Sequence, residues 1–307
     1  MAACIHDSRT STEAAACPFS LDSADHQCRI RKSPCRFAKK CKPSFQNLVS
    51  CDPIKWVRLQ ADKEDDVLWL KIREQALCDM EQEPILSKYY CSSILLHDSL
   101  ESALSNQLAA KLSNTDLPRS ALMEVFARVL AEDEEVRRAI RADLKAVKER
   151  DPACISYAHC FLNFKGFLAC QAHRVAHKLW SQGRIVMALL IQSRVSEVFA
   201  VDIHPGANLG HGVVLDHATG IVIGETAVVG DNVTILHNVT LGGTGKVNGD
   251  RHPKVGDGVL IGAGTKVLGS IRVGDRAKIG AGSVVLKEVP PETTSVGNPA
   301  RLVGLKS

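Results

Sequence analysis

Residues 201–289 carry an aliphatic side chain at every sixth position, and this repeat restricts the folds that the chain can adopt. The regular spacing is interrupted twice: two extra residues are predicted to follow Ile221, a slip in the repeat, and a longer break follows Leu241. Its members are Ile203, Leu209, Leu215, Ile221, Val229, Ile235, Leu241, Val255, Ile261, Val267, Val273, Ile279 and Val285. A period of six fits neither an α-helix nor a simple alternating strand, but it is typical of a parallel β-helix whose short strands turn a corner every hexapeptide. We therefore predict about five stacked coils.

A second set of smaller residues lies two positions before most members of this series and is also predicted to face inward. The set includes Val201, Ala207, Val213, Thr219, Ala227, Val233, Val239, Val259, Thr265, Ala277 and Ser283. Charged and imidazole side chains in the same region should project outward, because the interior of a narrow solenoid has no room for them.

The residues before the repeat have a different periodicity. Within residues 62–199, apolar residues such as Val136, Ile140 and Leu144 show the three-to-four spacing of an amphipathic helix. Predicted helices cover residues 65–81, 100–112, 119–131, 134–148, 160–181 and 184–199. Residues 1–61 lack sustained periodicity and are expected to be a disordered basic arm or a transit segment, and residues 290–307 a C-terminal segment. The predicted fold class is α+β, with an all-α domain followed by a β-helix at residues 200–289.

Charge and cysteine content limit the possible partners and compartments. The net charge of +4 is modest and is concentrated in the first 60 residues, which argues against a nucleic-acid-binding body. No apolar run reaches the roughly 18 residues of a membrane span. The eleven Cys include no CxxC pair and none lies in the repeat, so they predict neither a disulfide framework nor a zinc site. We expect a cytoplasmic protein, with the plastid as the alternative because the arm has some features of a transit peptide.

Ionisable residues gather in the first coils of the repeat, including Asp202, Asp216, His217 and His237. His217 follows Asp202 by fifteen residues, three short of a turn of three hexapeptides, so the two could lie near one corner on successive coils. A carboxylate that orients an imidazole is the usual arrangement of a general base near neutral pH. Two solvated surface residues remain the alternative.

The break in the repeat predicts a loop over residues 242–253. Leu241 and Val255 are fourteen residues apart where six would suffice, and the insertion is rich in Gly and ends in Arg251, His252 and Pro253. We interpret it as a flap that brings a cation and an imidazole to a site, since the guanidinium fork matches a carboxylate. A solvated surface excursion is the alternative. The Gly-Gly-Thr-Gly-Lys run lacks the spacing of a phosphate-binding loop.

A metal site at the stacked histidines is not predicted. His217 and His237 should occupy equivalent positions one coil apart, but the next equivalent position lies near Ala263, which is no ligand. A catalytic zinc ion usually requires three protein ligands.

Several motifs together carry a family resemblance. They are Lys148-Glu149-Arg150-Asp151-Pro152-Ala153, Gly166-Phe167, Asp202-Ile203-His204-Pro205, Leu215-Asp216-His217-Ala218-Thr219-Gly220, Thr240-Leu241-Gly242-Gly243-Thr244-Gly245-Lys246, Gly249-Asp250-Arg251-His252-Pro253 and Gly297-Asn298-Pro299-Ala300-Arg301. Over about residues 64–304 the chain resembles the plant-type serine O-acetyltransferases of the hexapeptide-repeat acyltransferase superfamily. The resemblance implies a left-handed coil, whereas the general rule for crossovers would give a right-handed one.

The resemblance also implies a reaction and a set of site residues. The reaction is acetyl transfer from acetyl-CoA to the hydroxyl of L-serine, which gives O-acetyl-L-serine and CoA as the first step of cysteine biosynthesis. No permanently bound cofactor is implied. By similarity, the residues are His217 as general base, Asp202 as its orienting partner, Arg251 for the serine carboxylate, Asp151 and Asp216 for the ammonium, and His252 beside the hydroxyl.

Further implications concern CoA and the partners of the chain. In the family CoA lies in a groove between neighbouring subunits, and the matching positions here are Gly243, Ala263 and Lys278. The resemblance implies trimers built through the β-helix and paired through the helical domain, together with competitive inhibition by cysteine. Family members often bind O-acetylserine sulfhydrylase through a tail that ends in Ile, but this sequence ends in Leu305-Lys306-Ser307, so that partnership stays open.

Two other functions compete with this interpretation. A related acyltransferase that acts on a sugar or an antibiotic is disfavoured by Asp151, Asp216 and Arg251, because those substrates lack the matching ammonium and carboxylate. A non-catalytic scaffold is disfavoured by the intact Asp202 and His217 but remains open.

Overall fold

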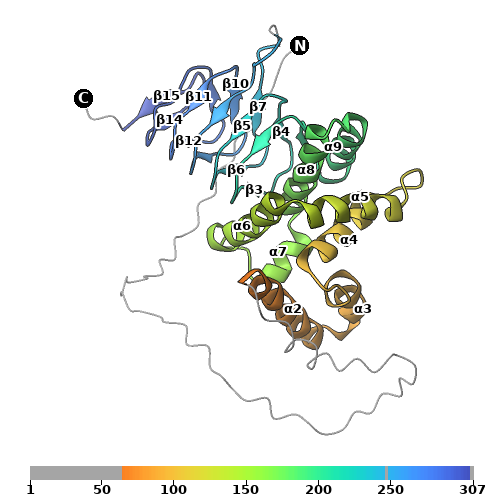
Figure 1. Cartoon of the computed structure of the whole chain (residues 1–307). Coiled ribbons are helices and arrows are strands. Elements are labelled where there is room, and N and C mark those ends of the chain that lie inside the picture. Colours follow the sequence, from red (N-terminus) through yellow and green to blue (C-terminus); the bar gives the residue numbers. More distant parts are fainter. Residues whose placement is uncertain (1–63, 246–247, 305–307) are drawn as a thin grey trace, which may run out of the picture. The chain divides into compact units, whose positions relative to one another are not determined.

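The computed structural model describes residues 64–245 and 248–304 (Figure 1). Residues 1–63, which include the predicted arm, lie outside the described residues, as do residues 246–247 of the predicted loop and residues 305–307. In the two described ranges, no helix is both long enough and apolar enough to cross a membrane.

Helices occupy the first part of the described chain (Figure 1). They are α2 (Glu64–Gln82), α3 (Ser87–Tyr90), α4 (Leu100–Leu112), α5 (Arg119–Glu132), α6 (Glu134–Arg150), α7 (Tyr157–Asn163), α8 (Lys165–Ser181) and α9 (Ile185–Phe199), with two short helical turns, η1 (Pro84–Leu86) and η2 (Cys91–Leu95). Ser99, Asp133 and Ser156 cap α4, α6 and α7, and each side chain accepts a hydrogen bond from the backbone N–H three residues later. Such caps satisfy N–H groups that have no partner within the helix.

The single helix predicted over residues 160–181 is wrong, because two helices meet at Phe164. The backbone of Phe164 is extended, and it ends α7 and precedes α8. The first turn of α8 then lies directly against the β-helix, where a Cβ on Gly166 would collide with the Leu215 carbonyl oxygen. No proline or glycine marks the break at Phe164 itself. The break therefore coincides with the contact between the start of α8 and β3.

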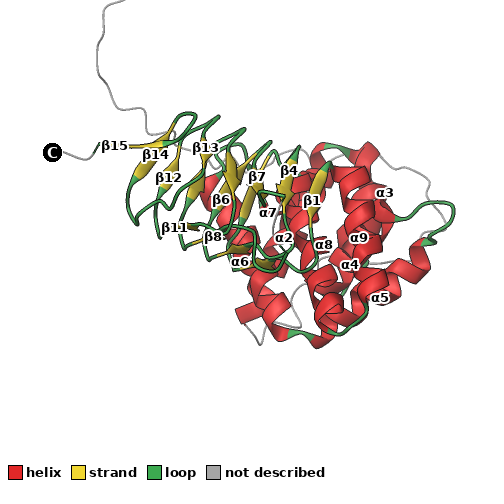
Figure 2. Cartoon of the chain, turned by 90° about the horizontal axis from the view of Figure 1, so that it is seen from above, coloured by secondary structure: helices red, strands yellow, loops and turns green. Residues whose placement is uncertain are grey.

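The second part of the chain is a parallel β-helix with three faces, which we call sheets A, B and C. Sheet A contains β1 (Val201–Ile203), β4 (Ile221–Ile223), β7 (Thr240–Gly242), β10 (Lys266–Leu268) and β13 (Val284–Val285). Sheet B contains β2 (Asn208–Leu209), β5 (Val228–Val229), β8 (Lys254–Val255) and β11 (Arg272–Val273). Sheet C contains β3 (Val214–Asp216), β6 (Thr234–Leu236), β9 (Leu260–Ile261), β12 (Lys278–Ile279), β14 (Thr294–Val296) and the antiparallel β15 (Arg301–Val303). The predicted order of a helical part followed by a parallel β-helix is confirmed. Figure 2 shows the strands in successive layers beyond the helices.

The slip in the repeat lies one strand earlier than the sequence predicted. Ile221 pairs with Val201, so the two extra residues precede Ile221 and belong to the turn between β3 and β4. His217 and Ala218 both have left-handed backbone there, with φ of 54° and 60°. As a result Ala218 is buried and Thr219 is exposed, so the prediction that Thr219 faces inward is wrong.

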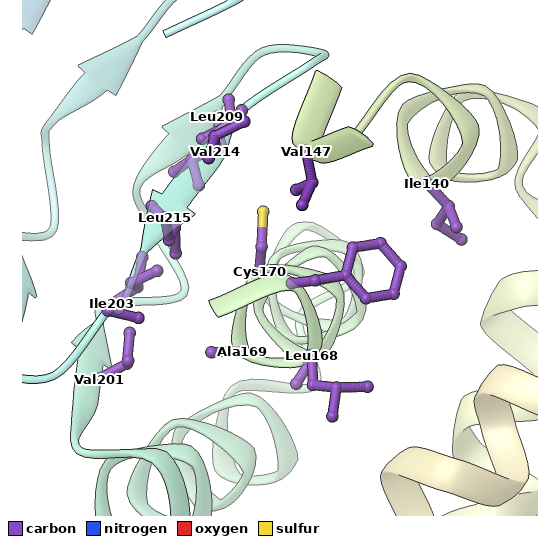
Figure 3. Packing of buried hydrophobic residues seen from close by; sticks show 14 of the residues in the cluster. Ile140, Val147, Leu168, Ala169, Cys170, Val201, Ile203, Leu209, Val214 and Leu215 are labelled. Atoms are coloured by element: carbon purple, nitrogen blue, oxygen red, sulfur yellow. The ribbon is translucent and has the colours of Figure 1, made fainter. Parts of the chain in front are cut away.

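A buried ion pair joins the helices to the first coil. Arg174 of α8 donates from Nε to Asp143 of α6 at 2.9 Å and from Nη1 to the Leu209 carbonyl at 3.2 Å. Asp143 Oδ1 also accepts from the Val213 N–H at 2.9 Å. Around this pair, apolar side chains of α6 and α8 pack on the strands of the first coil, as Figure 3 shows for Val147. These contacts fix α6 and α8 relative to the first coil.

Candidate active site

His217 and His237 lie on one edge of the β-helix, the C–A corner, where the chain passes from sheet C to sheet A. Leu215 pairs with Ile235, so the two histidines occupy the same position on successive coils, as the sequence predicted. Their ring centroids are 5.7 Å apart and their planes meet at 74°. The pairing of Ile235 with Ile261 puts Ala263 next in line. Within residues 64–245 and 248–304, no group of three or more His, Cys, Asp or Glu side chains is arranged to hold a metal ion.

A cavity of about 290 Å³ opens beside His217, between the helices and the C–A corner. Its wall includes Asp151 at the end of α6, Asp216 at the end of β3 and the His217 ring. The Asp216 Oδ1 atom is 3.8 Å from His217 Nε2, and the Asp151 carboxylate accepts the Ala153 N–H at 2.8 Å. Three predicted site residues from both parts of the chain therefore meet here. The two carboxylates can bind an ammonium group, and the neighbouring imidazole can accept a proton.

Asp202, the predicted partner of His217, has a different neighbour in this chain. It projects from β1 on sheet A, and its Oδ1 accepts a hydrogen bond from Gln192 of α9 at 2.7 Å. No hydrogen bond or ion pair joins Asp202 to His217, both of which belong to the described residues. The His217 side chain is 76% exposed. Its ring is therefore not fixed by Asp202 in the single chain, and the orienting role of Asp202 stays a prediction.

Arg251 and His252 lie at a different edge, the A–B corner, where the chain passes from sheet A to sheet B. Arg251 donates from Nη2 to Glu225 Oε2 at 2.6 Å. This hydrogen bond lowers the pKa of Glu225, so the carboxylate stays charged at neutral pH. The guanidinium is thereby held by Glu225 at the base of the loop, and its Nη1 donates to the Gly249 carbonyl at 3.1 Å.

His252 is a buried imidazole that accepts a hydrogen bond through Nδ1. Its Nδ1 accepts the Thr226 N–H at 3.1 Å, so the neutral ring carries its proton on Nε2. Burial and the nearby Arg251 charge lower its pKa, which favours this neutral form. The ring fills the space beside two glycines: a Cβ on Gly224 would collide with it, and a Cβ on Gly243 would lie 3.6 Å from Nε2.

The structure divides the predicted site residues between two edges of one chain. Asp151, Asp216 and His217 meet at the C–A corner, whereas Arg251 and His252 meet at the A–B corner. The predicted CoA-binding positions are divided in the same way. Gly243 is at the A–B corner, Ala263 is at the C–A corner, and Lys278 projects from the exposed face of β12 in sheet C.

Three residues near these corners were not assigned a role from the sequence. Glu225 holds Arg251, His237 contacts the His217 ring, and His159 of α7 lines the cavity beside Asp151 and Asp216. The repeat count could have identified Glu225, because it lies at the A–B corner one coil before the loop. His159 offered no such signal, since its place in the wall depends on how α7 packs.

The parallel β-helix of six-residue repeats places the chain among the hexapeptide-repeat transferases. Residues 252–287 match the bacterial transferase hexapeptide family of six repeats, and residues 68–172 match the serine acetyltransferase N-terminal family. The chain is 68% identical over 244 residues to chloroplastic serine acetyltransferase 1 of Arabidopsis thaliana, which covers 80% of this chain and 78% of the relative. It is 66% identical over 248 residues to mitochondrial serine acetyltransferase 3 of the same plant, covering 81% of this chain and 63% of that one.

Solved structures agree with these relatives. Soybean serine acetyltransferase complexed with serine has a TM-score of 0.78 and 59% identity, and it covers 79% of this chain and all of that chain (100%). Serine acetyltransferase in complex with coenzyme A from Brucella abortus has a TM-score of 0.77 and 49% identity, covering 79% of this chain and 97% of that chain. The chain belongs to the serine acetyltransferase family.

Proposed function

We propose that this chain transfers the acetyl group of acetyl-CoA to the hydroxyl of L-serine, giving O-acetyl-L-serine and CoA, which is the first step of cysteine biosynthesis. The observation that carries the proposal is the cavity that joins Asp151 and Asp216 to His217. It offers two carboxylates for an ammonium group beside a base for a hydroxyl. The soybean complex with serine and the Brucella abortus complex with coenzyme A support the two substrates.

In the proposed mechanism, His217 accepts the proton of the serine hydroxyl while the oxygen attacks the thioester carbonyl carbon. The tetrahedral intermediate then collapses, the C–S bond breaks, and the CoA thiolate receives the proton from the His217 imidazolium. A positioned base of this kind contributes on the order of 10² to 10⁴-fold to the rate. We assign Asp202 to orient the imidazole once the site is assembled.

The oxyanion of the intermediate requires a hydrogen-bond donor, and we assign His237. It lies next to His217 on the C–A corner, and Ala263 follows it in register. An acetyl group carried along this corner from Ala263 toward His217 would pass beside the His237 ring. Preorganised donors at such a position are worth about 10² to 10³-fold in kcat.

The two halves of the site are proposed to meet between subunits. Arg251 and His252 lie at the A–B corner of one chain, so they can reach an ammonium-binding cavity at a C–A corner only in a neighbouring copy. When the A–B corner of each subunit contacts the C–A corner of the next, repetition of this one contact closes into a ring. A ring of three subunits suits a β-helix with three faces. In this arrangement Arg251 binds the serine carboxylate, His252 donates toward the hydroxyl, and CoA runs between subunits along Gly243, Ala263 and Lys278.

The helical part is proposed to pair such trimers. Ile85 and Leu96, in the segment between α2 and α4, are 87% and 75% exposed. We infer that these two side chains contribute to the contact between trimers. Binding of O-acetylserine sulfhydrylase stays a prediction, as does competitive inhibition by cysteine.

The test is thiol release from acetyl-CoA by the purified full chain, with and without L-serine. We expect serine-dependent release that is lost in His217→Ala and retained in the matched control His211→Ala, which removes a histidine near the third edge of the same coil. Release with another hydroxyl acceptor but not with serine would contradict the substrate. Silence with every acceptor would favour a non-catalytic scaffold.

For the location in the cell, we propose the cytoplasm, with the plastid as the alternative. The relatives include both a chloroplastic and a mitochondrial protein. Microscopy of the full chain with a C-terminal fluorescent tag would separate these compartments, and a plastid signal that depends on residues 1–61 would contradict the cytoplasmic proposal.

A further inference from the structure

His217, the proposed general base, lies in a turn with uncommon backbone geometry, which we call the His217 turn (residues 216–220). His217 and Ala218 both have left-handed backbone, with φ of 54° and 60°. Residues other than glycine rarely adopt this conformation, and they keep it only where the surrounding structure holds them. The His217 side chain is 76% exposed, so the direction of its ring depends on the backbone of this turn.

Hydrogen bonds within the His217 turn connect His217 to Thr219. The Thr219 N–H donates to the His217 carbonyl at 2.7 Å, and the Ala218 N–H donates to the Asp216 carbonyl at 2.6 Å. Thr219 is also bonded to the next coil, since its carbonyl accepts the Asn238 N–H at 2.7 Å. A displacement of Thr219 is therefore transmitted to His217.

Two residues at the start of α8 contact the His217 turn from the helical part. Lys165 donates a hydrogen bond from Nζ to Thr219 Oγ1, which lies 54 residues further along the chain. Gly166 approaches so closely that a Cβ on it would lie 3.2 Å from the Ala218 Cβ, besides colliding with the Leu215 carbonyl oxygen. The helical part thus holds the turn by one side-chain hydrogen bond and one close backbone approach.

Lys165 lies beside the reacting groups, although the proposed acetyl transfer assigns it no step. It lines the cavity that contains Asp151, Asp216 and the His217 ring. A cation is an unexpected neighbour for an ammonium-binding site, because like charges repel. The hydrogen bond directs the Lys165 ammonium to the Thr219 hydroxyl instead. This contact gives the lysine a role that does not require it to bind the substrate.

We propose that Lys165 is a positioning residue for the acetyl transfer: through Thr219 it holds the turn that directs the His217 imidazole toward the serine hydroxyl. The proposal rests on the proposed function, because that function assigns His217 as the base. A base must lie within hydrogen-bond reach of the proton that it accepts, and a misplacement of about 1 Å can cost on the order of 10²-fold in rate. Since the Gly166 contact remains when Lys165 is replaced, we expect a smaller loss, of about tenfold in kcat.

The test is a double-mutant cycle in the full chain, measured by steady-state thiol release from acetyl-CoA. Lys165→Met removes the ammonium, and Thr219→Val removes the hydroxyl that accepts its hydrogen bond. We expect each variant to lower kcat about tenfold while the KM for serine changes by about twofold or less, and the double variant to be no slower than either single one. Thr219→Ser keeps the hydroxyl and should retain the wild-type kcat. The matched control is Lys178→Met, which breaks a pair with Asp133 at the other end of α8 and should also retain it.

Amide hydrogen exchange, followed by mass spectrometry, provides a measurement that does not depend on activity. The Ala218 and Thr219 N–H groups are hydrogen-bonded within the His217 turn. A peptide that covers residues 215–222 should therefore exchange faster in Lys165→Met and in Thr219→Val than in wild type. In the control Lys178→Met, the same peptide should exchange at the wild-type rate.

Three results would overturn the proposal. One is a wild-type kcat in Lys165→Met, since the turn would then hold His217 without the lysine. Another is a raised KM for serine with an unchanged kcat, which would make Lys165 a substrate-binding residue. The third is a double variant in which the two losses of kcat multiply, because the side chains would then act separately. If wild type has no serine-dependent release, the proposed function fails instead, and the exchange of residues 215–222 still decides whether Lys165 holds the turn.

Discussion

Replacement of Asp143 by Asn tests whether the buried ion pair attaches the helices to the β-helix. Asp143 is fully buried and accepts hydrogen bonds from Arg174 Nε at 2.9 Å and Nη2 at 3.0 Å, from Gln171 at 2.9 Å and from the Val213 N–H at 2.9 Å. Asn keeps the shape but replaces one accepting oxygen with an NH₂ group. The buried Arg174 charge then has no counter-charge. Loss of one partner of a buried pair costs about 3–5 kcal/mol of unfolding free energy.

The assay is guanidinium-induced unfolding of wild type and Asp143→Asn at one protein concentration, because assembly would otherwise shift the apparent stability. A matched control is Glu124→Gln, which breaks the exposed pair with Arg128 at 3.0 Å. Such surface pairs contribute about 1 kcal/mol or less. A loss in Asp143→Asn no greater than that in the control would refute the reasoning.

Three further predictions concern the A–B corner and α8. Gly224→Ala should push the His252 ring out of its place, so we expect kcat/KM for serine to fall on the order of 10²-fold, and steady-state kinetics with normal unfolding would check it. Glu225→Gln should release Arg251 and raise the KM for serine, with little change in the KM for acetyl-CoA. Because the Arg251 hydrogen bond lowers the pKa of Glu225, wild type should keep this contact at neutral pH and lose it only in acid. A wild-type KM for serine that already rises near pH 6 would contradict this prediction. Burial lowers the pKa of His173 to about 3, whereas in the unfolded chain the imidazole has its usual pKa of about 6.5. Between these two values the unfolded chain binds a proton that the folded chain does not, so the free energy of unfolding decreases as the pH is lowered from about 6.5 to about 3. Between pH 6 and pH 5, the free energy of unfolding of His173→Asn should therefore decrease by about 1 kcal/mol less than that of wild type, as measured by denaturant titrations. An equal pH dependence of the two unfolding free energies would contradict the prediction.

Counting along the repeat was enough to predict the positions on the C–A corner. The register of His217, His237 and Ala263 follows from the sequence because each coil of a solenoid contacts only its neighbours. The position of the slip was predicted wrongly. Two successive residues in left-handed backbone, His217 and Ala218, absorb the extra length, and neither is a glycine that would have indicated the turn.

The sequence by itself determined the parallel β-helix and the helical part before it, because short-range periodicity specifies both. The roles of the site residues were implied by the family resemblance. Tertiary structure alone decided which of these residues meet. Asp151 reaches Asp216 only because α6 and α8 dock on the first coil through Arg174 and Asp143, a contact between segments far apart in the chain.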